Sequence, residues 1–471
     1  MKNKLVAKLF SSGLQAVALQ VLGGLFFYLI SIYLSKDNFG VISWLNAVTL
    51  FLTTVLGFGL DQVVVRRIAV SPRSDWAAAA FFAHSIIGFV ITFLILILLQ
   101  ALVKSKAVYQ LLPWFFAAQG LIYMGIPLKQ FLNAKEKFMP YGIIAIVSNT
   151  GKIVAACLLF QQQKLNIQGV MIILICSAAF ELGCLLVFLL TKTTFGFRFP
   201  LKAYTKLLKE ASAPYLSVLF DMSLSRLDWI LLGIITTNTI LADYSFAYRA
   251  FELARLPMVI IAPVILPRLS RLMAANNNQP DIATRQSINS FGTVELFFGV
   301  MVPLILNILW EPVVGRITGG KYGYSNSSEF LILSACIPLQ LFINLLWSLS
   351  FGARKYGSVT TITVICAAIN VGLNLILIPI WGGNGAASAF LLTTLLQCGL
   401  YYRLVGKQIM AVQLRPFILF MVFAILIYLL VAPMHIMGKL ALSVTLYPLA
   451  AILSKQITKQ QWYHFKNFLS R

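Results

Sequence analysis

Nine charged side chains interrupt long apolar stretches of this chain, and four of them are cations that could bind an anionic ligand such as a phosphate. Near the middle of a membrane, each lipid-facing charge costs about 2.5 to 3.5 kcal/mol. The summed cost of nine such charges would exceed the whole free energy of unfolding of a typical protein. They must therefore face a wet or paired interior. They are Lys152, Glu181, Asp221, Arg226, Asp228, Arg249, Glu252, Arg255 and Glu295.

Helical spacing places several of these groups on common faces. Tyr244, Tyr248, Glu252 and Arg255 follow one another by four, four and three residues, which makes one stripe along a helix. Arg249 lies three residues before Glu252. Glu252 could form an ion pair with Arg249 or Arg255 that locks helices together. The same side chains could instead line a cavity. Both interpretations stay open.

Two further segments carry polar faces. Asp221 and Asp228 share a face, whereas Arg226 points about 140° away from Asp221. Amide and indole groups at 340, 344 and 347 suit hydrogen bonding and stacking on sugars. The candidate substrate ligands are Arg226, Arg249, Arg255, Lys152, Tyr244, Tyr248, Gln340, Asn344 and Trp347. The candidate ion-coupling or helix-pairing carboxylates are Asp61, Glu181, Asp221, Asp228, Glu252 and Glu295.

No motif predicts a cofactor. The six cysteines all lie in apolar segments without a CxxC pair, and the three histidines are scattered, so neither set predicts a metal site. The segment from Gly315 to Lys321 has the GxxxxGK spacing of a phosphate loop. Tyr322 stands where Ser or Thr would hold magnesium, and no strand is predicted before it. We interpret it as an external glycine-rich turn and expect no direct ATP hydrolysis.

The elements that position these residues are membrane-spanning helices. The chain is 59% hydrophobic and 11% charged, too apolar for the surface of a soluble globule of 471 residues. It divides into about fourteen apolar blocks, each long enough to cross a bilayer as a helix. The blocks are 10–34, 40–62, 77–102, 111–130, 140–160, 168–191, 212–236, 241–266, 291–314, 329–351, 358–380, 384–403, 416–433 and 439–454.

The cations between the blocks predict the orientation. With both termini in the cytoplasm, 26 of the 37 Lys and Arg residues fall in cytoplasmic segments and only seven in external ones. The net charge of +23 lies in short loops without the basic stripe of a nucleic-acid groove. We therefore expect anionic membrane lipids, and no nucleic acid, as partners of that face. The first block is too long for a cleavable signal.

Polar stretches and an internal repeat predict the domains. The basic segment 192–211 separates an N-terminal six-helix lobe, 1–191, from a C-terminal lobe, 212–403, followed by an additional helix pair and tail, 404–471. A shift of 202 residues aligns Ser43-Trp44 with Ser245-Phe246. These matches predict an all-α polytopic protein in which two pseudo-twofold-related six-helix bundles surround a central cavity, as in transporters.

The motifs resemble those of the Wzx-type oligosaccharide flippases, a polysaccharide transporter branch of the multidrug/oligosaccharidyl-lipid/polysaccharide exporter superfamily. The most specific stretches run from Ser225 to Gly233, from Ala242 to Arg249 and from Leu266 to Ser270. Shorter supporting segments are Leu34 to Gly40 and Gly319 to Tyr322. No single motif is diagnostic, but their order and spacing along the chain match the family.

The resemblance implies a bacterial inner-membrane protein that moves undecaprenyl-pyrophosphate-linked oligosaccharide units to the periplasmic leaflet. Such transport serves O-antigen, capsule or exopolysaccharide synthesis. Basic side chains would hold the pyrophosphate, and aromatic and amide side chains the glycan. Alternating access of two lobes would suffice, with cavity carboxylates as candidate proton or sodium sites. A polysaccharide polymerase and a chain-length regulator are candidate partners.

Three alternatives stay open. A lipid II flippase of the same superfamily also has fourteen helices and differs mainly in substrate. A multidrug antiporter would have about twelve helices and a cavity suited to cations; the extra helix pair near 416–454 and the four intramembrane cations argue against it. From a different class, a membrane polymerase or ligase would need a large external catalytic loop, and the external gaps are too short for one.

Overall fold

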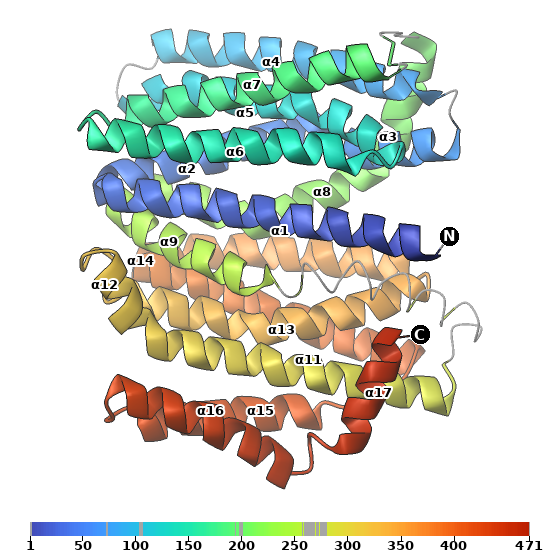
Figure 1. Cartoon of the computed structure of the whole chain (residues 1–471), viewed down its shortest axis with the longest axis vertical. Helices are drawn as coiled ribbons and strands as arrows, with labels where there is room; N and C mark the ends of the chain where they lie inside the picture. Colours follow the sequence, from blue (N-terminus) through green and yellow to red (C-terminus); the bar gives the residue numbers. More distant parts are fainter. Residues whose placement is uncertain are drawn as a thin grey trace. The chain divides into compact units, whose positions relative to one another are not determined.

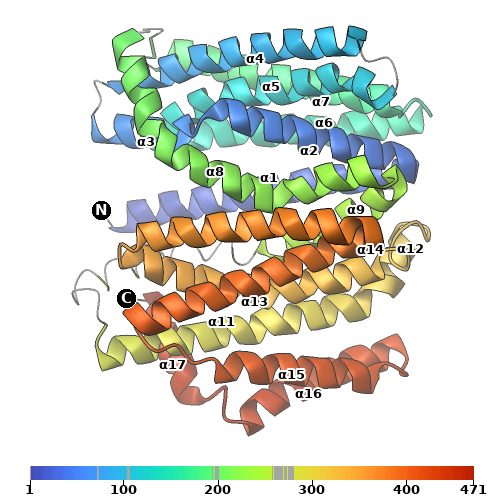
Figure 2. The ribbon, with the colours of Figure 1, turned by 180° about the vertical axis from the view of Figure 1, so that it is seen from behind.

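The described part of the chain consists of helices joined by turns and loops and forms two compact units, Met1–Ala242 and Asp243–Arg471 (Figures 1 and 2). The computed structural model describes residues 2–71, 74–102, 107–193, 195–196, 201–256, 258, 269, 273 and 280–470. No strand occurs among these residues. The predicted fold class, an all-α polytopic membrane protein, is therefore confirmed. The predicted functional lobes 1–191 and 212–403, and the helix pair 404–471, stay predictions.

The first unit is a bundle in which α5 packs against α3, α4 and α7, and α1 packs against α6 (Figure 1). Its helices are α1 (Lys2–Tyr33), α2 (Lys36–Gly57), α3 (Leu60–Val70), α4 (Trp76–Leu102), α5 (Ala107–Ala134), α6 (Phe138–Gln161), α7 (Ile167–Lys192), α8 (Leu201–Ile235) and the first turn of α9 (Asn238–Ala254). Helix α8 begins within the predicted basic linker 192–211, so the second half of that linker is helical. Arg67 of α3 pairs with Glu210 of α8 at 2.6 Å.

A backbone break ends the second predicted block near its C-terminal end. Helix α2 stops at Gly57, and Phe58 and Gly59 take left-handed conformations with φ of 50° and 65°. A side chain at Gly59 would lie 2.8 Å from the backbone nitrogen of Tyr215, so both the positive φ and the close approach favour glycine. The predicted block 40–62 is thus wrong at its end, where the chain turns into the separate helix α3.

The second unit is built around α13, which packs against α11 and α14. Its elements are the remainder of α9, α11 (Ile282–Leu309), the π-helix η2 (Trp310–Val314), α12 (Gly315–Ile317), α13 (Ser327–Gly352), α14 (Tyr356–Gln408), α15 (Arg415–Val431), α16 (Ile436–Leu453) and α17 (Lys459–Ser470). Most of the predicted block 241–266 beyond Ala254 lies outside the described residues. A helix, and not a strand, precedes the Gly319-Gly320 turn, as expected for a turn that is not a phosphate loop.

Helix α14 is a hairpin of two antiparallel arms that meet at Gly382. This residue has φ 56° and ψ −126°, a conformation open to glycine alone. The arms lie side by side, because Asn370 Nδ2 donates to Thr393 Oγ1 at 3.2 Å. The break falls between the predicted blocks 358–380 and 384–403. The position of this turn is therefore confirmed.

The hairpin leads to a stability prediction at Gly385. A Cβ atom there would overlap the backbone oxygen of Leu377 on the other arm, whereas a Cβ at Gly399 of the same helix would meet nothing within 4 Å. We expect Gly385→Ala to lower the free energy of unfolding by about 1–3 kcal/mol through overpacking. Gly399→Ala is the matched control and should leave stability unchanged or slightly raised. Thermal unfolding in detergent measures both, and equal stability of the two variants would contradict the close approach.

Nine helices in the described part of the chain are long and apolar enough to cross a membrane, and the shorter Val17–Tyr33 and Arg415–Val431 are also apolar. Helices α8 and α9 are absent from that set, and both carry charges along their length, Arg226 and Asp228 in α8 and Arg249 and Glu252 in α9. One of the nine, α14, covers two predicted blocks. The protein is thus a multi-pass membrane protein, and the count of fourteen spans stays a prediction.

Candidate substrate and ion-coupling sites

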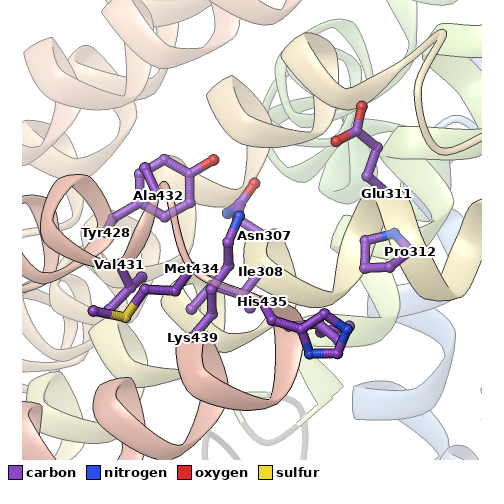
Figure 3. A pocket seen from close by; sticks show the side chains of 11 residues that line it. Asn307, Ile308, Glu311, Pro312, Tyr428, Val431, Ala432, Met434, His435 and Lys439 are labelled. Atoms are coloured by element: carbon purple, nitrogen blue, oxygen red, sulfur yellow. The ribbon is translucent and has the colours of Figure 1, made fainter.

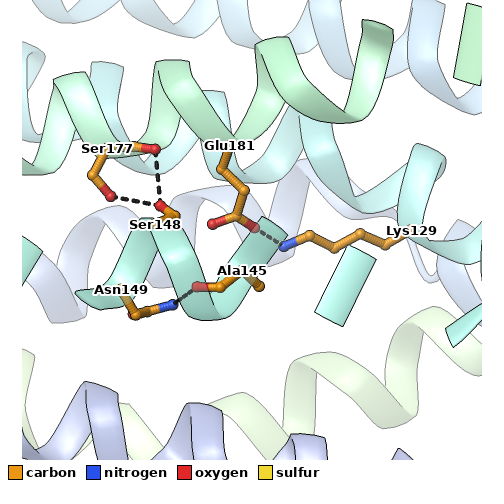
Figure 4. A network of polar contacts seen from close by, with 6 residues as sticks. All are labelled: Lys129, Ala145, Ser148, Asn149, Ser177 and Glu181. Carbon is orange, nitrogen blue, oxygen red and sulfur yellow. Dashed lines mark hydrogen bonds and ion pairs between the residues drawn. The ribbon is translucent and has the colours of Figure 1, made fainter. Parts of the chain in front are cut away.

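In the first unit, Glu181 of α7 pairs with Lys129 of α5 at 2.5 Å (Figure 4). Glu181 lies eleven residues before the last residue of α7, Lys192, so the pair is well inside the bundle. Lys152 of α6 lies 6.0 Å from the Phe26 ring and interacts electrostatically with both members of the pair. Two of the predicted site residues, Lys152 and Glu181, are thus brought together.

Lys129 is a partner that the sequence analysis missed. Its position at the end of the predicted block 111–130 placed it among the cytoplasmic cations. The structure instead extends α5 to Ala134 and directs the lysine toward Glu181 (Figure 4). In the sequence, only the Glu181 carboxylate on α7 pointed to a partner such as Lys129, because an intramembrane anion needs a cation nearby.

Small polar side chains beside this cluster tie α6 to α7. The Ser148 hydroxyl lies 2.9 Å from the Ser177 hydroxyl and donates to the Ser177 carbonyl at 3.1 Å (Figure 4). Asn149 donates its amide to Ala145 O of its own helix. The Nδ2 group of Asn149 is therefore engaged within α6.

The polar segment of α8 is buried and held by aromatic side chains. Arg226 is 8% exposed, and its guanidinium lies 4.9 Å from the centre of the Trp229 ring. Asp228 is 2% exposed and accepts a hydrogen bond from the Trp229 backbone N–H at 2.8 Å. Helix α2 fixes this segment, because the Trp44 indole donates to Ile230 O and packs on Gly233 so closely that a Cβ there would overlap it.

Asp221 and Asp61 do not join this buried segment. Asp221 is exposed although it shares a helix with Asp228, and Asp61 is half-buried in the first turn of α3. Neither carboxylate forms an ion pair with a described residue. The predicted common face of Asp221 and Asp228 therefore contains one exposed and one buried carboxylate. Their roles in ion coupling stay predictions.

In the second unit, Arg249 and Glu252 pair within α9. Arg249 Nη1 lies 2.8 Å from Glu252 Oε2, one helical turn away. Arg249, one of the two arginines that the spacing left open, is thus a partner of Glu252. An ion pair within one helix cannot lock two helices together, but it lowers the cost of holding both charges in the membrane.

The two tyrosines of the predicted stripe form part of an aromatic core. Tyr244 is 0% and Tyr248 2% exposed, and their ring centres lie 5.8 Å apart. Tyr248 also makes edge contacts with Phe251 and Phe390. Side chains this buried have no surface for a ligand in this structure. Their predicted role in glycan binding would need them to become accessible and stays a prediction.

Arg255 and Glu295 line one apolar cavity of about 110 Å³ between the end of α9, α11 and α13. Phe298, Ile337 and Phe465 are among its other lining residues. Among the described residues, Arg255 Nε and Glu295 Oε1 are buried without a hydrogen-bond partner. The guanidinium lies 5.1 Å from the Phe251 ring. The structure thus brings two predicted site residues to one cavity without pairing them.

The polar face of α13 carries further unsatisfied donors. Asn344 is buried with its Nδ2 group unpaired among the described residues, and so is the hydroxyl of Ser348. Gln340 and Trp347 are half-buried on the same helix, and Trp347 stacks on Phe351 at 5.1 Å. Each unsatisfied buried donor costs about 1–3 kcal/mol. A polar ligand or water at this face would recover that energy.

A histidine network at the α2–α3 break was not foreseen. His84 Nε2 lies 2.7 Å from Leu56 O, and Nδ1 lies 2.6 Å from the Tyr204 hydroxyl. Since a carbonyl oxygen only accepts, Nε2 must carry the hydrogen, and Nδ1 of the neutral ring accepts from Tyr204. Tyr123 donates to the same Leu56 oxygen at 2.9 Å. The network joins four helices and is structural, so scattered histidines in the sequence gave no indication of it.

We expect His84→Phe to lower the free energy of unfolding by about 1–3 kcal/mol, because it leaves the Tyr204 hydroxyl without its partner and removes one of two donors to Leu56 O. Tyr324→Phe, at an exposed position, is the matched control and should have little effect. Thermal unfolding in detergent measures the difference. Equal stability of the two variants would show that the network contributes nothing.

The sequence matches the model of a family described as polysaccharide biosynthesis protein over residues 5–273, more than half of the chain. The chain belongs to the polysaccharide biosynthesis protein family. Within this polysaccharide biosynthesis protein, the matched range includes the charged segments of α6, α7, α8 and α9. No curated protein matches the sequence.

Solved structures share the fold of this polysaccharide biosynthesis protein. A lipid II flippase MurJ, in an inward closed conformation, has a TM-score of 0.75 at 14% identity, covering 94% of this chain and 99% of that one. An inward-facing multidrug resistance MATE family transporter of the MOP superfamily has a TM-score of 0.66 at 14% identity, with 83% and 95% covered. A MOP superfamily transporter from Pyrococcus furiosus has a TM-score of 0.60 at 12% identity, covering 85% of this chain and 96% of that one. The fold is that of MOP superfamily transporters.

Proposed function

We propose that this protein is a flippase that moves undecaprenyl-pyrophosphate-linked oligosaccharide units from the cytoplasmic to the periplasmic leaflet by alternating access. The units would serve O-antigen, capsule or exopolysaccharide synthesis in a bacterial inner membrane. Family membership and the transporter fold support movement of a polysaccharide precursor. The identity of the lipid-linked unit rests on the chemistry of the buried side chains.

The observation that carries the proposal is an arginine beside an aromatic ring in each unit, buried at Arg226 and half-buried at Arg255. Arg226 lies over Trp229 and Arg255 over Phe251, at 4.9 and 5.1 Å. Stacking uses the face of a guanidinium and leaves its N–H edge directed outward, which is the edge that binds phosphate oxygens in pairs. Arg255 Nε is buried without a partner among the described residues. A pyrophosphate would satisfy this donor.

The glycan and the coupling ion would use different groups. Asn344, Ser348, Gln340 and Trp347 supply hydrogen bonds and stacking for sugar rings. Carboxylates such as Glu295 and Asp228 are candidates for proton or sodium coupling, since charge changes inside a membrane are used in this way. Arg249 and Glu252 form an ion pair with each other, so they suit support of the site more than direct binding.

A lipid II flippase is the second candidate, favoured by the TM-score of 0.75 over 94% of the chain. Both candidates move a prenyl pyrophosphate with sugars, so the buried arginines suit either. A polymerase and a chain-length regulator are candidate partners only for the first. A multidrug antiporter is less consistent with buried arginines, because most such cargo is cationic.

Purified protein in liposomes tests the proposal. We expect it to move a fluorescent polyprenyl-pyrophosphate oligosaccharide across the bilayer without ATP, at a rate well above that of empty vesicles. In a deletion strain, radiolabelled completed units should accumulate while surface polymer is lost. If the units are never completed, the protein is a synthase accessory; if completed units still reach the periplasm, it is not their principal flippase. Normal polymer with failing cell-wall synthesis would favour lipid II.

The proposed orientation, with both termini in the cytoplasm, makes a separate prediction. Alkaline phosphatase folds only outside the cytoplasm, so fusions after Lys104 or Lys321 should be active and fusions after Lys206 or Arg285 inactive. Western blots of the fusions control for abundance. The opposite activity pattern would reverse the assignment of inside and outside.

A further inference from the structure

The second unit has a polar pocket of about 520 Å³ where α11 passes into the π-helix η2 (Figure 3). The loop between α15 and α16 forms its opposite wall. Its polar side chains are Asn307, Glu311, Tyr428, His435 and Lys439. π-helical segments occur frequently at functional sites, because the extra residue redirects side chains. Here Glu311 lies within η2 itself.

An apolar groove of about 340 Å³ adjoins this pocket. Residues of α11, α13 and α15 line it, including Leu304, Ala335 and Ala424. Asn307 and Tyr428 line both the groove and the polar pocket. The two cavities therefore adjoin and together form an amphipathic site, with one apolar arm along the helices and one polar end.

The charges at the polar end are mixed. Lys439 offers an ammonium and His435 a ring, whereas Glu311 offers a carboxylate. Asn307 adds a directed acceptor, because its Nδ2 group already donates to Pro303 O at 2.8 Å and to Ser334 Oγ at 2.7 Å. Its Oδ1 atom is left to accept from a ligand. In Figure 3, Asn307 and Lys439 lie between Tyr428 on one side and Glu311 and His435 on the other.

We propose that this site binds one aminophospholipid, with an acyl chain in the groove and a phosphoethanolamine headgroup in the pocket. Lys439 and His435 would meet the phosphate, and Glu311 with Asn307 Oδ1 would accept hydrogen bonds from the primary ammonium. The headgroup carries one charge of each sign, as the pocket does. By the predicted orientation, this end of α11 belongs to the external leaflet.

The site is distinct from the one proposed for the transported unit. A polyprenyl pyrophosphate head is strongly anionic, and Glu311 would repel it, whereas Glu311 favours an ammonium. A choline headgroup has the same charges but no N–H to donate, so the two acceptors select the primary amine. The lipid would serve as a resident ligand of the α11, α15 and α16 interface.

Native mass spectrometry of the purified full chain tests the proposal with lipid titration. We expect phosphatidylethanolamine to bind about tenfold more tightly than phosphatidylcholine or phosphatidylglycerol, since one charge-assisted contact is worth about a factor of ten. Glu311→Gln should abolish the preference over phosphatidylglycerol. Ala424→Trp, which fills the groove, should weaken binding of all three lipids.

Lys164→Met, at an exposed site of the first unit, is the matched control for Lys439→Met. The control should leave the affinity for phosphatidylethanolamine unchanged, and Lys439→Met should lower it about tenfold. Thermal unfolding without lipid confirms that each variant is folded. Equal affinity for the three phospholipids, an unchanged Glu311→Gln variant, or tighter binding of polyprenyl pyrophosphate would each overturn the proposal. None of these outcomes depends on transport.

Discussion

Alanine in place of Arg255 is expected to remove surface polymer almost completely, while the protein stays inserted and abundant. Arg226→Ala should behave alike. In each case a guanidinium that lies over an aromatic ring is lost, and with it the paired N–H contacts proposed for the pyrophosphate. The loss should exceed a hundredfold, because two strong charge-assisted contacts of about 1.5–3 kcal/mol each disappear. Immunoblots of the polymer in a complemented deletion strain measure it.

Lysine variants and a matched arginine sharpen this test. Arg255→Lys keeps the charge but loses the planar fork, so partial function is expected. Arg316→Ala removes an arginine that is exposed in α12 and should support normal polymer. If Arg226→Ala and Arg255→Ala also support normal polymer, the two arginines only hold helices together, and the proposed substrate site is wrong.

Removal of the Glu181 carboxylate should have the largest effect on stability. Glu181→Met leaves Lys129 and Lys152 as uncompensated cations inside the first unit, which should cost about 3–5 kcal/mol. The double variant Lys129→Met with Glu181→Met should recover part of this loss, because apolar side chains replace the partly buried ion pair at little cost and only Lys152 then lacks its anion. Thermal unfolding and the yield of folded protein measure both.

A second ion pair, close to the end of α5, is the control for Glu181→Met. Lys135 contacts Asp75 at 2.8 Å just beyond α5 and α4, where both side chains are about a quarter exposed. Asp75→Asn should cost no more than about 1 kcal/mol. If Glu181→Met is no more damaging than Asp75→Asn, water reaches the Lys129–Glu181 pair, and the charges are not buried in the sense proposed.

The helices could be predicted from the sequence because apolar length is itself the property that a bilayer selects. Even the Gly382 turn was placed, since a glycine pair separated two apolar runs. The break at Phe58 and Gly59 could not be predicted, because a single apolar residue and a glycine in an apolar run are compatible with a continuous helix. Helices α3 and α17 were missed since they do not span a membrane.

The candidate site was predictable in its residue types but not in its pairings. The free-energy cost of a charge in a membrane was enough to identify the intramembrane charges as candidate site residues. Their partners depend on rotations of whole helices, which place Lys129 on Glu181 and leave Arg255 apart from Glu295. The stripe through Tyr244 and Tyr248 followed the helical period correctly, but the period does not tell whether a stripe meets a cavity or a core.

The break after α2 also constrains the order in which the protein can be assembled. Leu56 O lies at the end of α2, and its hydrogen-bond donors come from Tyr123 of α5 and His84 of α4, while Tyr204 of α8 contacts the other ring nitrogen of His84. During synthesis the ribosome produces α2 well before these helices. We therefore expect the full set of these hydrogen bonds to form only after α4, α5 and α8 have all been made. The turn after α2 is thus synthesised early and completed late.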